Sequence, residues 1–285
     1  MEKDILQAIE ASVEELSKAQ KKIAEYILAN YEKAAFMTAI RLARFAEVSE
    51  STVVRFAMEL GYDGYPEMRR ALQDSMRSKL TSVQRIKVAN DRLSSHDILT
   101  QVLSSDIEQI RQTMENTDSE VFAKAVDAIV EAKSIYILGL RSSSFLAKFM
   151  GFYFDLLFSN SRVISESPDS EVFEQIVRMS SDDVLIAIGF PRYSRRTIKT
   201  MQYAHSVGTK VIAITDSMAS PLTELADISL CAKSEMISFL DTFVAPLSLV
   251  NALVVAVSEK APSELYENFE RLERIWDEYG VYEQV

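Results

Sequence analysis

Two short segments of this chain place arginine and serine directly after a glycine. Gly139 is followed by Arg141 and three serines, and Gly189 is followed by a segment that ends at Ser194. Each glycine ends an apolar run and precedes a helical pattern, so each segment opens a helix. Backbone N–H groups at a helix N-terminus attract anions, and a guanidinium pairs bidentately with phosphate or carboxylate. The segments predict a site for an anionic small molecule, with the candidate ligand-binding residues Ser142, Ser143, Ser144, Gly189, Arg192, Tyr193 and Ser194.

The same residues also fit a purely structural interpretation. Serine is a common helix N-cap, a role open to Ser142 and Ser194, and Arg195 and Arg196 fit an ordinary charged surface. A dinucleotide site is not indicated, because neither segment contains G-x-G-x-x-G.

The elements that hold these segments are short strands alternating with helices. Continuous apolar, β-branched runs separated by helical patterns are typical of a parallel sheet buried on both faces. We therefore expect a doubly wound, flavodoxin-like α/β domain with five parallel strands. The expected strands are 134–138, 162–164, 183–188, 210–215 and 228–230.

A second candidate site lies near the N-terminus, where residues 38–61 have the pattern of a helix-turn-helix. Ala43 provides the small residue at the helix crossing, Ser49 can cap the second helix, and Gly61 can end it. The outward positions of that helix carry hydroxyls and one arginine, which suit phosphate and base edges. The candidate DNA-binding residues are Ser49, Glu50, Ser51, Thr52, Val54, Arg55 and Arg41.

An ordinary amphipathic helix pair would show the same spacing, so this alternative stays open. The turn itself contains Glu47, where glycine is the easier residue. Either the turn avoids a positive φ at this position, or it carries strain there.

Length and charge indicate two domains. The chain has 285 residues and a net charge of −11, and residues 1–80 contribute 12 Lys/Arg against 13 Asp/Glu, so the acidity lies in the remainder. We expect an all-α helix-turn-helix domain over 1–79, a linker and the start of a connecting helix over 80–106, and an α/β domain over 107–285. Thr117 to Glu120 has the spacing of a capping box that would start a further helix.

Composition argues against several classes of protein. No apolar stretch is long enough to span a membrane, and no basic-then-apolar leader opens the chain, so a cytoplasmic location is expected. The single cysteine, Cys231, allows no internal disulfide and no cysteine-cluster metal site, and it fits a small residue in an apolar strand. We expect no metal and no cofactor.

These motifs together resemble a known family. A helix-turn-helix that ends in residues 55–65, followed by a sugar-isomerase-type (SIS) α/β domain, resembles the RpiR family of bacterial transcription regulators. The resemblance extends over nearly the whole chain and includes 214–217 and 220–222. It implies operator DNA as one partner, a phosphosugar or related metabolite as the effector, and a homodimer or homotetramer.

The effector loops differ from the usual SIS pattern. Arg141 stands where the first loop usually has its second glycine, with Ser143 at the serine position, and Arg192 and Tyr193 replace small residues in the second loop. A sugar acid or another carboxylate therefore remains an alternative to a sugar phosphate.

An aldose-ketose isomerase is the rival function, since SIS domains also perform that reaction. It needs a positioned base, and His96 and His205 do not follow strand ends, which leaves Glu235 as the carboxylate to test. Because no nucleophile–base pair stands out, we expect a regulator rather than an enzyme, with a non-responsive DNA-binding scaffold as the third interpretation.

Overall fold

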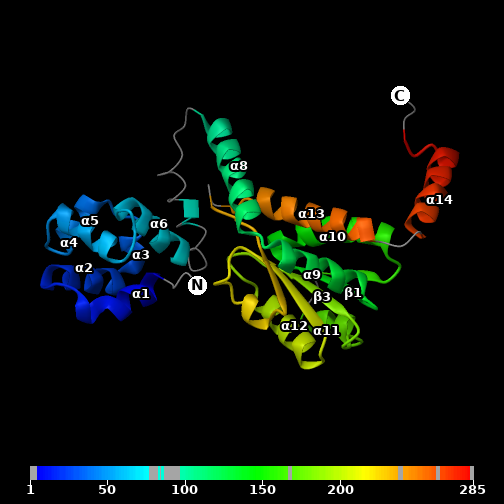
Figure 1. Cartoon of the computed structure of the whole chain (residues 1–285), viewed down its shortest axis with the longest axis horizontal. Helices are drawn as coiled ribbons and strands as arrows, with labels where there is room; N and C mark the ends of the chain where they lie inside the picture. The colour runs from blue at the N-terminus through cyan, green and yellow to red at the C-terminus, as the bar shows by residue number, and fades with distance from the viewer. Residues whose placement is uncertain are drawn as a thin grey trace. The chain divides into compact units, whose positions relative to one another are not determined.

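The computed structural model describes residues 5–76, 83, 85–86, 97–165, 169–236, 240–260 and 264–282 (Figure 1). The chain forms two compact units, Met1–Arg92 and Leu93–Val285. Most of the expected linker, and with it His96, lies outside the described residues.

The N-terminal unit is entirely helical in its described residues, as expected. Ser17 starts the second helix with a capping box, in which its side chain accepts from the Gln20 N–H and Gln20 returns a contact to the Ser17 N–H. The apolar residues at helical spacing, such as Ile9, Ile23 and Ile27, are fully buried. The helices are α1 (Ile5–Ser12), η1 (Val13–Glu15), α2 (Lys18–Ala29), α3 (Tyr31–Ala34), α4 (Ala39–Phe45), α5 (Glu50–Glu59) and α6 (Tyr65–Met76).

The second unit is built on a five-stranded, all-parallel sheet with the order β2-β1-β3-β4-β5. This confirms the expected doubly wound fold, and each strand lies within one residue of its expected bounds. The strands are β1 (Ile135–Gly139), β2 (Ser161–Ile164), β3 (Val184–Ile188), β4 (Lys210–Thr215) and β5 (Ile228–Cys231).

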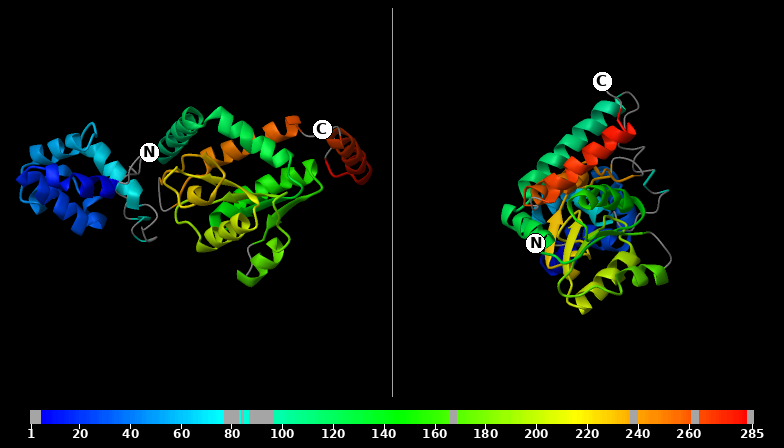
Figure 2. Two further views of the ribbon diagram at one scale, coloured as in Figure 1. Left: turned by 60° about the horizontal axis from the view of Figure 1, so that its bottom comes forward. Right: turned by 90° about the vertical axis from the view of Figure 1, so that its right-hand side faces the viewer.

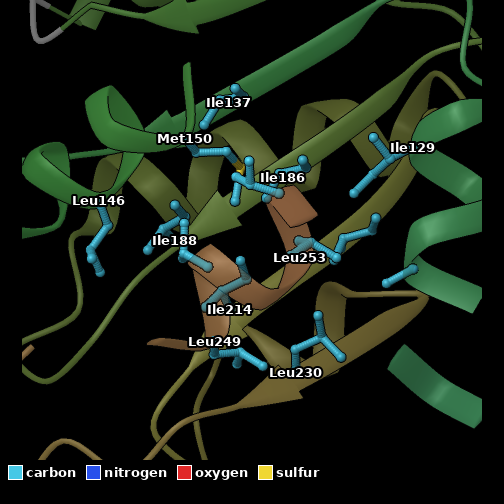
Figure 3. Packing of buried hydrophobic residues seen from close by; sticks show 14 of the residues in the cluster. Ile129, Ile137, Leu146, Met150, Ile186, Ile188, Ile214, Leu230, Leu249 and Leu253 are labelled. Atoms are coloured by element: carbon cyan, nitrogen blue, oxygen red, sulfur yellow. The ribbon is translucent and has the colours of Figure 1, made fainter. Parts of the chain in front are cut away.

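Helices cover both faces of this sheet, which explains why its central strands read as continuous apolar runs. On one face lie α9 (Ser119–Val130), α10 (Ser144–Leu157) and α13 (Val244–Lys260), whose apolar residues share a core with Ile137, Ile186 and Ile214 (Figure 3). On the other lie α11 (Asp169–Ile176) and α12 (Arg195–Ser206), which pack on Leu138, Leu185 and their neighbours. Figure 2 shows these two helices together on their own side of the sheet.

The helix α8 (Ile98–Asn116) runs across the expected boundary at 106/107 and belongs to the second unit. Its buried residues are polar and hold the segment after β5. Gln109 Oε1 accepts from the Glu235 N–H at 2.6 Å, and Asp106 Oδ1 accepts from the Thr242 hydroxyl at 2.7 Å. This helix is therefore part of the α/β unit and not only a connection to it.

The helix after α8 begins one residue later than its capping-box spacing predicts. Asp118, not Thr117, is the N-cap of α9, and its carboxylate accepts from the N–H groups of Glu120 and Val121. Thr117 instead donates its hydroxyl to the Thr113 carbonyl at 2.6 Å. An aspartate can accept two such bonds at once, and it displaces threonine from the cap.

The remaining elements are η2 (Arg141–Ser143), η3 (Thr223–Leu225) and α14 (Glu264–Tyr279). Among the helices that the structure describes, none combines the length and the apolar character needed to cross a membrane.

Candidate functional site

The helix-turn-helix consists of α4 and α5. Thr38 caps α4 by accepting from the Arg41 N–H at 3.3 Å, and Ser49 caps α5 by accepting from the Thr52 N–H at 3.3 Å. Ala43, Val53 and Phe56 are buried between the helices, as the sequence pattern predicts. The second helix ends at Gly61, whose φ of 89° is the left-handed conformation that glycine adopts easily.

The start of α5 presents a cluster of hydroxyls. Ser49 Oγ lies 2.9 Å from Ser51 Oγ and 2.7 Å from Thr52 Oγ1. Glu50 and Val54 are exposed on the same helix. The cluster lies at the helix N-terminus, where phosphate or base edges would approach a recognition helix.

Two exposed arginines flank this cluster. Arg55 leans back along α5, with its Nε donating to the Ser51 carbonyl at 3.4 Å, and Arg41 projects from α4. Within the described part of the chain, neither guanidinium forms an ion pair with a carboxylate. Both are therefore available to an external anion.

The turn between α4 and α5 has a positive φ at Glu47, so of the two possibilities for this turn the strained one is correct. This residue has a φ of 55°, so the turn does require the left-handed conformation and a residue with a side chain occupies it. Its carboxylate lies 3.3 Å from Lys22 Nζ in an exposed ion pair, which offsets little of that strain.

The two candidate effector loops leave neighbouring strands at one edge of the sheet. Gly139, the last residue of β1, pairs with Ile188, the last residue of β3. Because the strand order reverses between β1 and β3, this is the topological switch point at which ligands bind in open α/β sheets. The fold thus brings together two segments that lie about 50 positions apart in the chain.

The first loop folds tightly over Gly139. A Cβ at this glycine would lie 2.4 Å from the Ser143 carbonyl oxygen, so only glycine fits. Arg141 has a φ of 57°, which explains in physical terms why glycine is usual in SIS domains at this position. Ser142 is exposed, Ser143 is buried, and Ser144 begins α10.

The N-cap role expected as the alternative for Ser142 belongs to the next residue. Ser143 is the N-cap of α10, although its side chain makes no capping hydrogen bond. The Ser142 hydroxyl is therefore not committed to the helix end.

In the second loop, two of the candidate side chains already form hydrogen bonds within the protein. Ser194 caps α12, with its hydroxyl accepting from the Arg196 N–H at 3.2 Å, and Tyr193 donates its hydroxyl to Asp216 Oδ1 at 2.7 Å. Arg192 is exposed, whereas Gly189 is buried against Leu222. Arg192 is thus an exposed cation of this loop.

Sequence reasoning gave no site role to the segment that follows β4. Thr215 donates to Ser220 Oγ at 2.7 Å and lies 3.2 Å from the Asp216 carboxylate, which in turn holds Tyr193. Asp216 therefore lies beside the second loop. Asp216 directly follows β4, the strand next to β3, and this position in the sequence is the signal that could have identified it.

Glu235, the carboxylate considered as a base, and His205, which was set aside, are both exposed. Glu235 lies in the segment held by α8, and His205 lies in the last turn of α12. Cys231 lies in β5, half-buried as expected, and burial raises the pKa of its thiol to about 11.

Comparison with known proteins accounts for both units. Residues 3–79 match a family model described as a helix-turn-helix domain of the rpiR family, and residues 128–256 match a model of the SIS domain. The chain belongs to the RpiR family of helix-turn-helix transcriptional regulators. The family resemblance inferred from the sequence is thereby confirmed.

Several curated relatives extend over nearly the whole chain. An uncharacterized HTH-type transcriptional regulator of Clostridium perfringens is 26% identical, over 92% of this chain and 95% of its own length. The HTH-type transcriptional regulator HexR of Pseudomonas aeruginosa is 26% identical, with 90% of each chain covered.

Solved structures agree with this fold. The sugar isomerase domain of an RpiR transcription factor from Sphaerobacter thermophilus superimposes with a TM-score of 0.60 at 26% identity, over 63% of this chain and 99% of that one. The NanR protein of Vibrio vulnificus, complexed with ManNAc-6P, has a TM-score of 0.59 at 23% identity, over 96% and 98% of the two chains.

Proposed function

We propose that this RpiR-family regulator binds operator DNA through α5 and that a phosphosugar or a related anionic sugar metabolite switches its affinity for that DNA. The observation that carries the effector assignment is the meeting of the two serine- and arginine-bearing loops at the β1/β3 switch point. NanR of Vibrio vulnificus, which shares this fold, has been solved with a phosphosugar.

The proposed effector contacts divide between charge and hydrogen bonding. Arg192 and the N–H groups at the starts of α10 and α12 bind the anionic group, with Ser142, Ser143 and Ser144 as further donors. Asp216 carries a carboxylate beside this loop and accepts from Tyr193. A carboxylate there repels a phosphate and favours sugar hydroxyls as its partners.

The proposed DNA contacts come from the outward positions of α5. Arg55 reads a base edge, while the Ser49–Ser51–Thr52 hydroxyl cluster and Arg41 contact phosphates. Glu50 and Val54 lie at the margin of this surface and contribute to which bases are accepted.

We further propose that the regulator acts as a homodimer or homotetramer. Successive half-sites on DNA require a protein with matching two-fold symmetry. Among the described residues, the helix α8 has an exposed apolar face that can receive a second copy, next to the polar face that it turns toward its own unit. That face consists of the exposed residues Leu99, Leu103, Ile107, Ile110 and Met114.

Binding without catalysis is the proposed outcome at the effector site. The relatives that match along the chain are described as transcriptional regulators. The carboxylate considered as a base, Glu235, lies in the segment that α8 holds, not in the β1 or β3 loop.

Thermal unfolding of the full chain tests the effector assignment. A ligand that binds only the folded state raises the unfolding midpoint. Matched sugars, sugar phosphates and sugar acids should give a rise for the phosphorylated compounds that their neutral parents do not give. A rise with sugar acids alone would reassign the effector to carboxylates, and no rise across a broad panel would favour the non-responsive scaffold.

A further inference from the structure

A cavity of about 370 Å³ lies between the edge strand β2 and the helix α11. Its lining includes Tyr136, Arg162, Ile164, Glu174, Gln175 and Arg178. Tyr136 is the second residue of β1 and pairs in register with Arg162, so both side chains point to the face covered by α11 and α12. The cavity is therefore separate from the loops that follow Gly139 and Ile188 at the carboxyl ends of the strands.

The Tyr136 side chain forms a buried polar wall of this cavity. The residue is only 2% exposed, and burial raises the pKa of its phenol. Among the described residues, no hydrogen bond involves the Tyr136 hydroxyl. The hydroxyl is not among the fully buried side-chain atoms that lack a partner, so it is accessible from the cavity and can donate to a bound molecule.

Two guanidiniums lie near the same side chain. The Arg162 guanidinium carbon lies 5.9 Å from the centre of the Tyr136 ring, and Arg178 is close enough to oppose the rise in the phenol pKa. Asp183 also faces the phenol, but its carboxylate already accepts from the Ser180 N–H and hydroxyl. Glu174 adds one negative charge to the lining, which leaves two guanidiniums against one uncommitted carboxylate.

We propose that this cavity is a second anion site, distinct from the effector site, which binds the phosphate group of a small metabolite. Arg162, Arg178 and Tyr136 together offer more hydrogen-bond donors than the two coplanar oxygens of a carboxylate can accept. A phosphate group offers three terminal oxygens and can accept more of these hydrogen bonds. Glu174 then faces the organic part of the ligand, whereas the Gln175 amide is already held by Ser165 and the Glu171 carbonyl. The cavity volume suits a molecule of this size.

Calorimetric titration of the full chain with inorganic phosphate, at fixed ionic strength, tests the assignment. Arg192→Gln removes the guanidinium proposed for the effector loop but leaves that site its N–H groups and serines, so the remaining phosphate binding belongs to the cavity only if the cavity substitutions weaken it further. In that background we expect Arg178→Gln to weaken the remaining binding at least tenfold and Tyr136→Phe to weaken it several-fold. Arg274→Gln, at an exposed position of α14, is the matched control and should change nothing.

Each other outcome is decisive. Loss of all phosphate binding in Arg192→Gln would overturn the second site and leave the effector assignment intact. Phosphate binding that persists in Arg192→Gln and is unchanged by both cavity substitutions would also overturn the second site. If Arg274→Gln weakens the binding as much as Arg178→Gln does, the phosphate is an adventitious ion only, and the second site is again overturned. Tyr136→Phe retains the ring, so an unfolding midpoint equal to or above that of the parent protein confirms that a lost signal reflects the hydroxyl.

Discussion

Arg55 is the side chain on which sequence-specific DNA binding should depend most. It is exposed on α5 and leans on the Ser51 carbonyl without an ion-pair partner among the described residues. Arg55→Ala should weaken binding to the operator by about 1–3 kcal/mol, because a bidentate contact to a base is lost. Fluorescence anisotropy at one fixed salt concentration measures this. Arg274→Ala is the control, and unchanged operator affinity in Arg55→Ala would remove α5 from its recognition role.

Arg192 should decide the effector response in the same way. It is an exposed cation of the β3 loop, at the β1/β3 switch point. Arg192→Ala should abolish the effect of the effector on DNA binding and leave binding without effector unchanged. The neighbouring exposed Arg195 provides the matched substitution, and a response that survives Arg192→Ala would show that the anion is held elsewhere.

Cys231 should be nearly inert in the folded protein. Its pKa is raised by burial to about 11 from 9.0, so the folded state holds the thiol proton more tightly than the unfolded chain. The linked stability is present in full below pH 9 and is lost as the pH rises toward 11. At pH 8 alkylation should be roughly 100-fold slower than in denaturant, because the reactive species is the thiolate. Equal rates in the two states would contradict the burial.

At the level of single residues, the sequence predicted which side chains occur at the site better than what each one does. Ser49 and Gly61 take the roles expected from local helix capping. The Tyr193–Asp216 contact joins residues 23 positions apart and depends on β3 and β4 being neighbours, which no local pattern reveals. Tyr193 therefore looked like a free ligand-binding group when its hydroxyl is already hydrogen-bonded.

The α4–α5 turn should be strained at Glu47, since its φ is 55°. Glu47→Gly should be more stable than Glu47→Ala by about 1 kcal/mol, because alanine retains the unfavourable left-handed conformation and glycine does not. Both substitutions remove the carboxylate near Lys22, so the comparison isolates the backbone. Denaturant unfolding measures the difference, and equal stabilities would mean that the turn relaxes.

Elements were predictable where burial follows sequence periodicity. The central strands β1, β3 and β4 are apolar on both faces, and all five strands were located within a residue. The packing of α8 was not predictable, because the residues it buries are Asp106, Gln109 and Thr113 while its apolar residues are exposed. A prediction from hydrophobic periodicity would bury the apolar face of such a helix, whereas α8 buries its polar face.

At the scale of the whole molecule, the exposed apolar face of α8 should set the oligomeric state. We expect a dimer or tetramer by light scattering, and Leu103→Lys with Ile107→Lys should shift it toward monomer, because lysines at the centre of an apolar contact face are costly to desolvate. A matched pair of lysines at Ser104 and Asn116, two exposed polar positions of the same helix, should leave the mass unchanged. A parent chain that is already monomeric would remove the proposed interface.

The hydrogen bonds between α8 and the segment after β5 decide where a shortened chain that contains the α/β unit can begin. A piece that begins at residue 107 would lack Asp106, and the Thr242 hydroxyl would lose its acceptor while the helix lost its first two turns. A piece that begins before Ile98 would keep the whole set of contacts. The border of the α/β unit therefore lies upstream of residue 107, and a piece that is to keep this unit intact has to include the whole of α8.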